Sequence, residues 1–222
     1  RKPRRTDKRG ETHPQGWFPP LFFRLFHLSS RDVFDMFASG YPANKEPTMK
    51  LNDLLLREQS RANTDTVIEI VMARPEVFEE LWHTMLLNED PLSRRAAWAA
   101  DYCAEKNPGL IRDKIEDLSA MVPRFSSDGL KRHALRMLSR SPLPDENLGI
   151  LADACFNWLQ SPTESVAVKM YSMVILHRIS ENIPEISREL YDLIEIQMGN
   201  ATPGFRNIGK KIMRKLLNSD AR

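Results

Sequence analysis

The sequence has little of what several large classes of protein require. Cysteine is rare: Cys103 and Cys155 are the two among 222 residues, and both lie within apolar helical patterns. Cysteines of this kind are typical of buried thiols in a reducing compartment, so we expect a cytoplasmic protein without a structural disulfide. No apolar run approaches the ~20 residues that a membrane helix needs. The longest run, residues 170–176, is expected to form the buried centre of a helix.

The common signatures of catalysis are absent too. The sequence contains no phosphate-binding loop, no Gly-x-Gly-x-x-Gly and no nucleophile elbow. Its histidines, which stand at no spacing typical of metal ligands, are His13, His27, His83, His133 and His177. We therefore expect no catalytic residue, no metal site and no cofactor, and we interpret the chain as a non-enzymatic protein.

Charge is unevenly distributed along the chain. Residues 1–48 carry nine Lys/Arg against five Asp/Glu, whereas residues 49–222 carry 23 against 25. The first of these segments begins with a polar, patternless stretch typical of disorder. It continues with a Phe-rich stretch that Pro19 and Pro20 interrupt, which fits neither a signal peptide nor a mitochondrial presequence. We expect two parts, an N-terminal extension of residues 1–48 and a helical domain of residues 49–222.

Two interpretations of the extension stay open. Lys45 and Glu46 must be encoded by purine-rich codons just upstream of Met49, where a bacterial ribosome-binding sequence would lie. Residues 1–48 would then be a translated leader or an over-extended gene start. The alternative is a genuine flexible arm, and a peptide from residues 11–44 in the native protein's mass spectrum would establish it.

What the sequence does have is a helical spacing of apolar residues from Asn52 onward. Intervals of three and four residues predict helices, and no segment has the alternation typical of strands. Four stripes carry the pattern: Phe78, Leu81, Trp82 and Met85; Ile111, Ile115, Leu118 and Val122; Leu148, Leu151, Ala152, Cys155 and Leu159; and Ile186, Leu190, Leu193 and Ile194. The fold class is expected to be all-α.

Prolines and capping residues mark where the helices are expected to begin. Six prolines each precede a helical stripe, at a first-turn position that needs no N–H: Pro75, Pro91, Pro108, Pro162, Pro184 and Pro203. Residues able to cap a helix stand before four of them: Asp90, Asn107, Ser161 and Thr202. The segment SPTE has the form of a capping box, in which Glu164 would reach back to the backbone N–H of Ser161.

One buried stripe recurs at a nearly constant distance. In the segment DPLSRRAAWAA, residues 90–100, its members are Leu92, Ala96, Ala99 and Ala100. The same spacing returns in three further sets: Leu130, Ala134, Met137 and Leu138; Val166, Met170, Met173 and Val174; and Phe205, Gly209, Ile212 and Met213. The first members are 38, 36 and 39 residues apart, with another amphipathic helix between. This pattern indicates about four two-helix units after an atypical N-terminal cap near residues 52–72.

The segment DPLSRRAAWAA resembles the second helix of a HEAT repeat, in which Asp-Pro opens the helix, an arginine follows and small residues line the packed face. The resemblance covers residues 63–218, and Met170 departs from it by standing where other units have alanine or glycine. It implies an armadillo-like, right-handed α-α superhelix that binds other macromolecules along its concave side. We therefore expect a scaffold for a protein partner, with nucleic acid as the alternative and no membrane insertion.

The repeat also predicts where helices approach most closely. Ala96, Ala134 and Gly209 hold equivalent positions, where a larger side chain would push neighbouring helices apart at a cost of ~1–3 kcal/mol. Ala97 lies one step around the helix and is expected to be outside the packed face, so Ala97→Leu should be tolerated better than Ala134→Leu.

Positions two and six residues beyond each first stripe residue are expected to point away from the core. They are Arg94 and Trp98, Arg132 and Arg136, Val168 and Ser172, and Asn207 and Lys211. Arginines beside a tryptophan suit an acidic or phosphate-bearing partner, so the expected binding surface is Arg94, Trp98, Arg132, Arg136 and Lys211. The alternative is that these basic side chains merely solvate a helix face.

Trp98, Asp101 and Arg136 suggest a narrower alternative. They resemble the aromatic residue, aspartate and arginine with which DNA-alkylation-repair glycosylases, also built from HEAT-like repeats, hold a damaged nucleotide. The rest of that family's aromatic cluster is not evident, and residues 49–222 are slightly acidic where a DNA-binding protein is usually basic. The opposing expectation is that Trp98 packs against the next unit and Asp101 pairs with a nearby cation.

The last predicted helix is amphipathic and basic. Phe205, Ile208, Ile212, Met213 and Leu216 are expected to face inward, and Arg206, Lys210, Lys211, Arg214 and Lys215 outward. This secondary basic surface could meet nucleic acid or an anionic surface. The simpler interpretation is a terminal capping helix whose cations complement the helix dipole.

Overall fold

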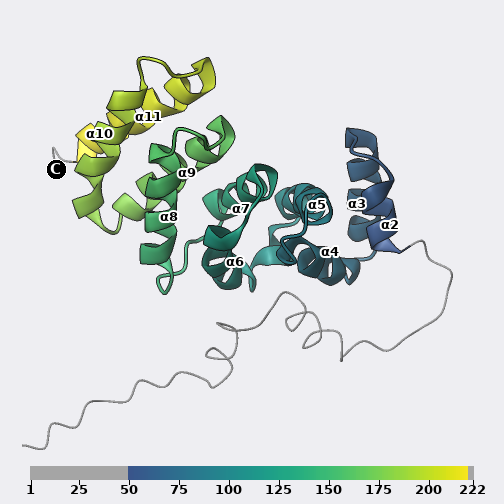
Figure 1. Ribbon diagram of the computed structural model, residues 1–222. Coiled ribbons are helices and arrows are strands. Elements are labelled where there is room, and N and C mark those ends of the chain that lie inside the picture. Colours follow the sequence, from purple (N-terminus) through teal and green to yellow (C-terminus); the bar gives the residue numbers. More distant parts are fainter. Residues whose placement is uncertain (1–49, 220–222) are drawn as a thin grey trace, which may run out of the picture. The chain divides into compact units, whose positions relative to one another are not determined.

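The computed structural model describes residues 50–219 (Figure 1). The extension of residues 1–48, and both interpretations of it, lie outside these residues. The described part forms ten α-helices and three short 3-10 helices, and it contains no strand, so the all-α expectation is confirmed. The α-helices are α2 (Leu51–Arg57), α3 (Arg61–Ala73), α4 (Val77–Leu86), α5 (Leu92–Lys106), α6 (Ile115–Met121), α7 (Asp128–Arg140), α8 (Leu148–Gln160), α9 (Val166–Ser180), α10 (Ser187–Gln197) and α11 (Pro203–Ser219). The 3-10 helices are η2 (Pro108–Ile111), η3 (Val122–Arg124) and η4 (Pro184–Ile186).

The helices pair in chain order and the pairs stack. Each first helix packs on the second helix that follows it, in the pairs α4 with α5, α6 with α7, α8 with α9 and α10 with α11. The second helices also pack on one another in series, from α5 to α7, α9 and α11, while α3 contacts α5 at the N-terminal end. Contacts between neighbouring units in this order are those of an α-α solenoid, as the repeat predicts.

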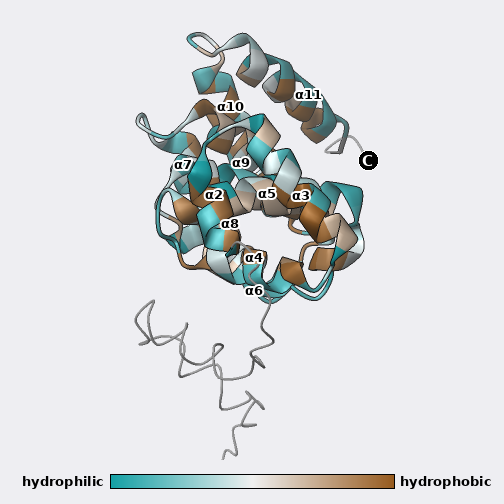
Figure 2. Cartoon of the chain, turned by 90° about the vertical axis from the view of Figure 1, so that its right-hand side faces the viewer, coloured by the Kyte–Doolittle hydropathy of each residue, from teal (hydrophilic) through white to brown (hydrophobic). Residues whose placement is uncertain are grey.

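Three of the predicted apolar faces, on α4, α7 and α11, form part of the core of this stack. Phe78, Leu81 and Met85 are fully buried on α4, and Leu130, Ala134, Met137 and Leu138 on α7. On α11, Phe205, Ile212 and Leu216 face inward as expected. The same helices carry hydrophilic residues elsewhere on their surface, so hydrophobic and hydrophilic segments alternate along them (Figure 2). Helix formation and burial therefore follow from the same pattern.

The register predicted for the third unit is wrong. On α9 Met173 is buried as predicted, but the other buried apolar and small positions are shifted by two residues from the predicted stripe, to Val168, Ser172, Ile175, Leu176 and Ile179. Val166, which was expected in the core, is 41% exposed, whereas Val168 and Ser172 were expected to face outward and are fully buried. The cause is the composition of α9, which is apolar on several sides, so its spacing distinguishes no single face.

The predicted start of α9 is also wrong. Ser161 caps nothing in α9; the N-cap is Ser165, whose hydroxyl accepts from the Val168 N–H. Glu164 accepts a hydrogen bond from the Ser165 N–H at 2.9 Å and forms an ion pair with Lys131 of α7 at 2.6 Å. The predicted capping box is thus replaced by a contact between units.

Of the three other predicted caps, two are confirmed and one is wrong. Asn107 accepts from the Gly109 N–H, and Thr202 accepts from the Phe205 N–H, as predicted. Asp90 caps no helix; its carboxylate accepts instead from Arg94 Nε at 2.9 Å.

Small residues lie where the helices meet, with one correction. Ala96 and Ala134 are fully buried, and a methyl group added at Gly209 would come within 3.0 Å of Ile194 Cγ2 on α10. Ala97 is fully buried as well, so the expectation that it lies outside the packed face is wrong. The alanine run of α5 packs on two sides, because α5 contacts α4, α3 and α7.

Cys103 and Cys155 are buried free thiols, as predicted, and burial raises the pKa of each to about 12. None of the helices between residues 50 and 219 is long and apolar enough to cross a membrane.

Candidate interaction surface on α5, α7 and α9

Four of the five residues predicted to form the binding surface come together. Arg94 and Trp98 on α5 and Arg132 and Arg136 on α7 line two adjoining hollows, of about 380 Å³ and about 290 Å³. Lys211 lies apart: it is exposed on α11 and lines neither hollow. The predicted surface is therefore a local feature of α5, α7 and the start of α9.

Trp98, Arg132 and His133 line both hollows and so lie between them. The larger hollow is completed by Gln59, Arg94, Asp128, Gly129, Ser165 and Ala167. The smaller one is completed by Asp101, Tyr102, Arg136 and Tyr171. Gly129 permits a close approach here, since a methyl group in its place would lie 2.5 Å from Arg94 Cδ.

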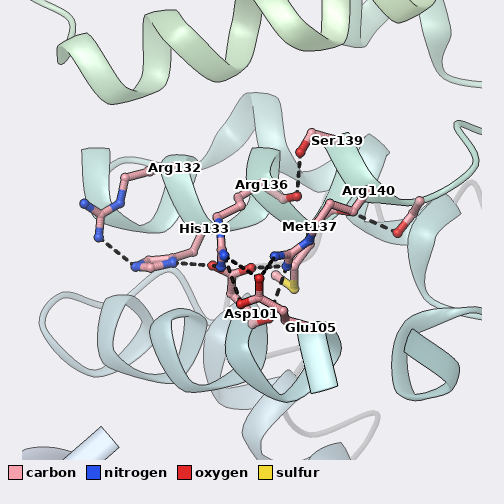
Figure 3. A network of polar contacts seen from close by, with 9 residues as sticks. Asp101, Glu105, Arg132, His133, Arg136, Met137, Ser139 and Arg140 are labelled. Atoms are coloured by element: carbon pink, nitrogen blue, oxygen red, sulfur yellow. Dashed lines mark hydrogen bonds and ion pairs between the residues drawn. The ribbon is translucent and has the colours of Figure 1, made fainter. Parts of the chain in front are cut away.

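Asp101 is the centre of a buried network between α5 and α7 (Figure 3). Its carboxylate, which is fully buried, accepts from His133 Nδ1 at 2.8 Å and from Arg136 at 2.7 Å, and it also pairs with Arg140. Arg136 extends the network to Glu105 at 2.9 Å. A buried carboxylate is costly unless it is paired and hydrogen-bonded, and Asp101 meets both conditions.

Protonation in the network follows from burial and these partners. Burial would raise the pKa of Asp101, but the hydrogen bonds from His133 and Arg136 offset this and lower it below its ordinary value. Burial lowers the pKa of His133, although Asp101 opposes the shift. For Arg136, the bonds to Asp101 and Glu105 outweigh burial and raise the pKa. Asp101 is therefore ionised and His133 neutral at neutral pH.

The neutral His133 ring can satisfy its neighbours in one tautomer. Arg132 contacts His133 Nε2 at 2.9 Å, and a guanidinium can only donate. Nε2 must then accept, so Nδ1 carries the proton and donates it to Asp101. A continuous chain of hydrogen bonds runs from exposed Arg132 through His133 to buried Asp101 (Figure 3).

Two aromatic side chains of this surface, Trp98 and Tyr102, already have partners. Trp98 stacks on His133 of the next unit, with ring centroids 6.4 Å apart and an interplanar angle of 18°. Two guanidiniums lie over the Tyr102 ring, that of Arg61 at 4.2 Å and that of Arg136 at 5.1 Å. Trp98 thus packs on its neighbouring unit, and Asp101 pairs with cations, which is the arrangement expected if these two residues are structural.

Sequence reasoning missed His133, Tyr102, Tyr171 and Arg140 in this surface. His133 was considered only as a metal ligand, and within residues 50–219 no group of three acidic, histidine or cysteine side chains is placed to hold a metal ion. A usable signal was present: His133, Arg136 and Arg140 follow Asp101 by 32, 35 and 39 residues, close to one repeat.

The predicted basic helix is confirmed as an amphipathic surface helix. The side chains of Arg206, Lys210, Lys211, Arg214 and Lys215 on α11 are all exposed. None of them lines the two hollows.

Charge separates between the two layers of helices. The second-helix layer, defined here as α5, α7, α9 and α11, carries 14 Lys/Arg and three Asp/Glu. The first-helix layer, α4, α6, α8 and α10, carries one Lys/Arg and eight Asp/Glu. The slightly acidic total of residues 49–222 hides this separation of charge between the two layers.

Comparison with known proteins identifies the repeat. A family model described as a HEAT repeat domain matches residues 51–216, which include every described helix except the last residues of α11. No curated protein and no solved structure matches the chain. The stacked helix pairs and the match over most of the sequence agree, and the chain belongs to the HEAT repeat domain family.

Proposed function

We propose that this protein is a non-enzymatic docking module that binds an acidic segment of a protein partner along its second-helix layer. The separation of charge carries the proposal, because 14 basic residues against three acidic ones in one layer attract a negatively charged surface. Two buried free thiols support a cytoplasmic location.

Hydrogen bonds between successive units support a rigid docking surface. Arg95 on α5 donates to the Leu55 carbonyl at 2.9 Å, and Arg178 on α9 donates to the Leu138 carbonyl at 2.7 Å. Arg140 on α7 likewise donates to the Asp101 carbonyl. A surface that is already ordered loses little conformational entropy when a partner binds.

Protein is favoured over nucleic acid by two features of the hollows. Asp90 and Asp128 lie among the cations, and a continuous phosphate backbone following the layer would meet these carboxylates. Bases stack on free aromatic faces, but Tyr102 is covered by two guanidiniums and Trp98 stacks on His133.

Affinity capture of the partner at low salt, followed by elution with increasing salt, tests the proposal. The double variant Arg132→Glu/Lys211→Glu reverses two exposed charges of the second-helix layer and should release the partner at lower salt than the wild type. The matched control, Glu116→Lys/Glu195→Lys, changes two exposed residues of the first-helix layer and should elute like the wild type.

Identical elution of both double variants and the wild type would contradict the assignment to the second-helix layer. A captured species that duplex DNA displaces, with the same dependence on Arg132 and Lys211, would instead establish the nucleic-acid alternative.

A further inference from the structure

We propose that Arg132 is the residue that recognises a carboxylate side chain of the partner, and that the hollows on either side of it take the neighbouring side chains. This inference rests on the proposed function and names the chemistry of its central contact. It depends on three observations: the charge state of Arg132, its orientation and the room around it.

Arg132 differs from the other arginines of the hollows because no carboxylate neutralises it. Arg94 pairs with Asp90 at 2.9 Å, and Arg136 pairs with Asp101 at 2.7 Å. Within residues 50–219, Arg132 has no ion pair, and its hydrogen-bond partner is the neutral ring of His133. A guanidinium with an uncompensated charge is the group on this surface that gains most from an incoming anion.

The bond to His133 orients Arg132. His133 is buried and is fixed in turn by its bond to Asp101, which two further arginines hold in place. One N–H of Arg132 is used by this chain of bonds, which leaves other donors of the planar guanidinium available to a ligand. An exposed arginine that is already oriented loses less entropy on binding than a freely rotating one.

The hollows give a ligand room on both sides of the guanidinium. Arg132 lies between volumes of about 380 Å³ and about 290 Å³. Trp98 borders both, and Ala167 adds apolar wall to the larger. An extended acidic segment can therefore place a carboxylate on Arg132, since carboxylates bind guanidiniums in bidentate geometry. The same segment can pack an apolar side chain against Trp98, since tryptophan is frequent among the residues that dominate binding energy at interfaces.

A single carboxylate fits these surroundings better than a run of phosphates. Asp128 lines the larger hollow, so negative charge borders Arg132 on that side, whereas the carboxylate of Asp101 is buried and paired with two arginines. One carboxylate bound at Arg132 avoids Asp128, whereas successive phosphates would not.

The test uses a labelled short peptide with glutamate between two phenylalanines, and the same peptide with glutamine in place of glutamate. Fluorescence anisotropy on the full chain should show that the wild type prefers the glutamate peptide. Arg132→Ala should weaken binding of that peptide about tenfold and leave the glutamine peptide almost unchanged, because a charge-assisted bond is lost. Arg132 is exposed, so the variant is expected to fold like the wild type.

Two further variants separate orientation from charge. In His133→Asn the amide can still donate to Asp101 but offers no ring nitrogen to Arg132. The preference for the glutamate peptide over the glutamine peptide should therefore shrink, while the circular dichroism spectrum stays helical. The matched control is Arg188→Ala on α10, which removes an equally charged, 81% exposed side chain from the first-helix layer. It should bind both peptides as the wild type does.

An unchanged preference in Arg132→Ala overturns the inference. If Lys211→Glu then lowers affinity for the glutamate peptide, the basic layer still binds acidic segments and the proposed function stands. If the wild-type protein binds neither peptide at low salt, or binds both equally, both proposals fail.

Discussion

His177 on α9 is a buried polar side chain of a different kind from Asp101. It is 7% exposed, and neither ring nitrogen has a hydrogen-bond partner among the described residues. The nearest carboxylate, that of Glu181, lies 3.8 Å from Nε2. Burial, together with the charge of Lys215, lowers the pKa of His177 from its ordinary value of 6.5. The fold therefore keeps this ring neutral, and no hydrogen bond from the described residues compensates for its burial.

We predict that His177→Leu reduces the loss of stability in mild acid. Above pH ~6.5 the ring is neutral in both states and titrates in neither. As the pH falls below ~6.5, the unfolded chain takes up a proton that the folded chain resists, so unfolding becomes easier by up to ~1.4 kcal/mol per pH unit. The variant lacks this contribution, while His133, whose pKa is shifted in the same direction, remains.

Urea unfolding at pH 8, 7, 6 and 5 measures the effect. At pH 8 the variant should be as stable as the wild type or more stable by ~1 kcal/mol, because a buried polar group without a partner has been replaced by an apolar one. Its advantage should widen toward pH 5. If the free energy of unfolding of the variant and of the wild type changed in parallel with pH, His177 would titrate alike in the folded and unfolded states and the prediction would be wrong.

Single residues also show how far the sequence could predict the site. Arg94, Trp98, Arg132 and Arg136 could be placed on one surface because helical spacing and the repeat length determine which way each side chain points. Their pairing could not be predicted in the same way. Distances between units decide which arginine pairs with Asp101 and which is left without an ion pair. The local sequence pattern does not specify these distances.

At the scale of the helix, prediction worked where one face differs clearly from the others. On α7 the polar residues Lys131, Arg132, Arg136 and Arg140 leave a single apolar face, and that face is buried. On α9 the apolar residues surround the helix, and packing selected a face two residues away from the predicted one. On α5 the alanines are small enough to pack on two sides, which is why Ala97 is buried too.

We predict that Ala134→Leu destabilises the protein by ~1–3 kcal/mol, because the added side chain has no space between packed helices. Ala97→Leu should now destabilise it as well. The appropriate control is Ala62→Leu, which adds the same bulk to an exposed position of α3 and should change stability by less than ~0.5 kcal/mol. Thermal unfolding followed by circular dichroism compares the three, and a wild-type melting temperature for Ala134→Leu would show that this position is not a close contact.

For the whole molecule, the important property is that contacts connect neighbours in the stack. Helix α5 packs on α3 and α7, and α9 packs on α7 and α11, while no extensive contact joins α3 to α9 or α11 within the described part. Arg95 connects α5 to the N-terminal cap and Arg178 connects α9 to α7, each through a backbone carbonyl about one repeat away. Stability in such a stack is a sum of units and of the interfaces between them.

We therefore predict that loss of one connecting hydrogen bond is felt locally. Arg178→Ala should lower the protection of backbone amides from hydrogen exchange in α9, α10 and α11, and leave α3 and α4 unchanged, since opening can begin at the weakened interface without unfolding the rest. Arg95→Ala serves as the mirror-image control and should lower protection in α2, α3 and α5 but not in α10 and α11. Mass spectrometry of peptides from each helix measures both patterns. If either variant lowers protection equally from α2 to α11, the helices unfold as one cooperative unit and the prediction is wrong. The rigidity of the docking surface would then depend on every interface in the stack, not only on the interfaces beside Arg132.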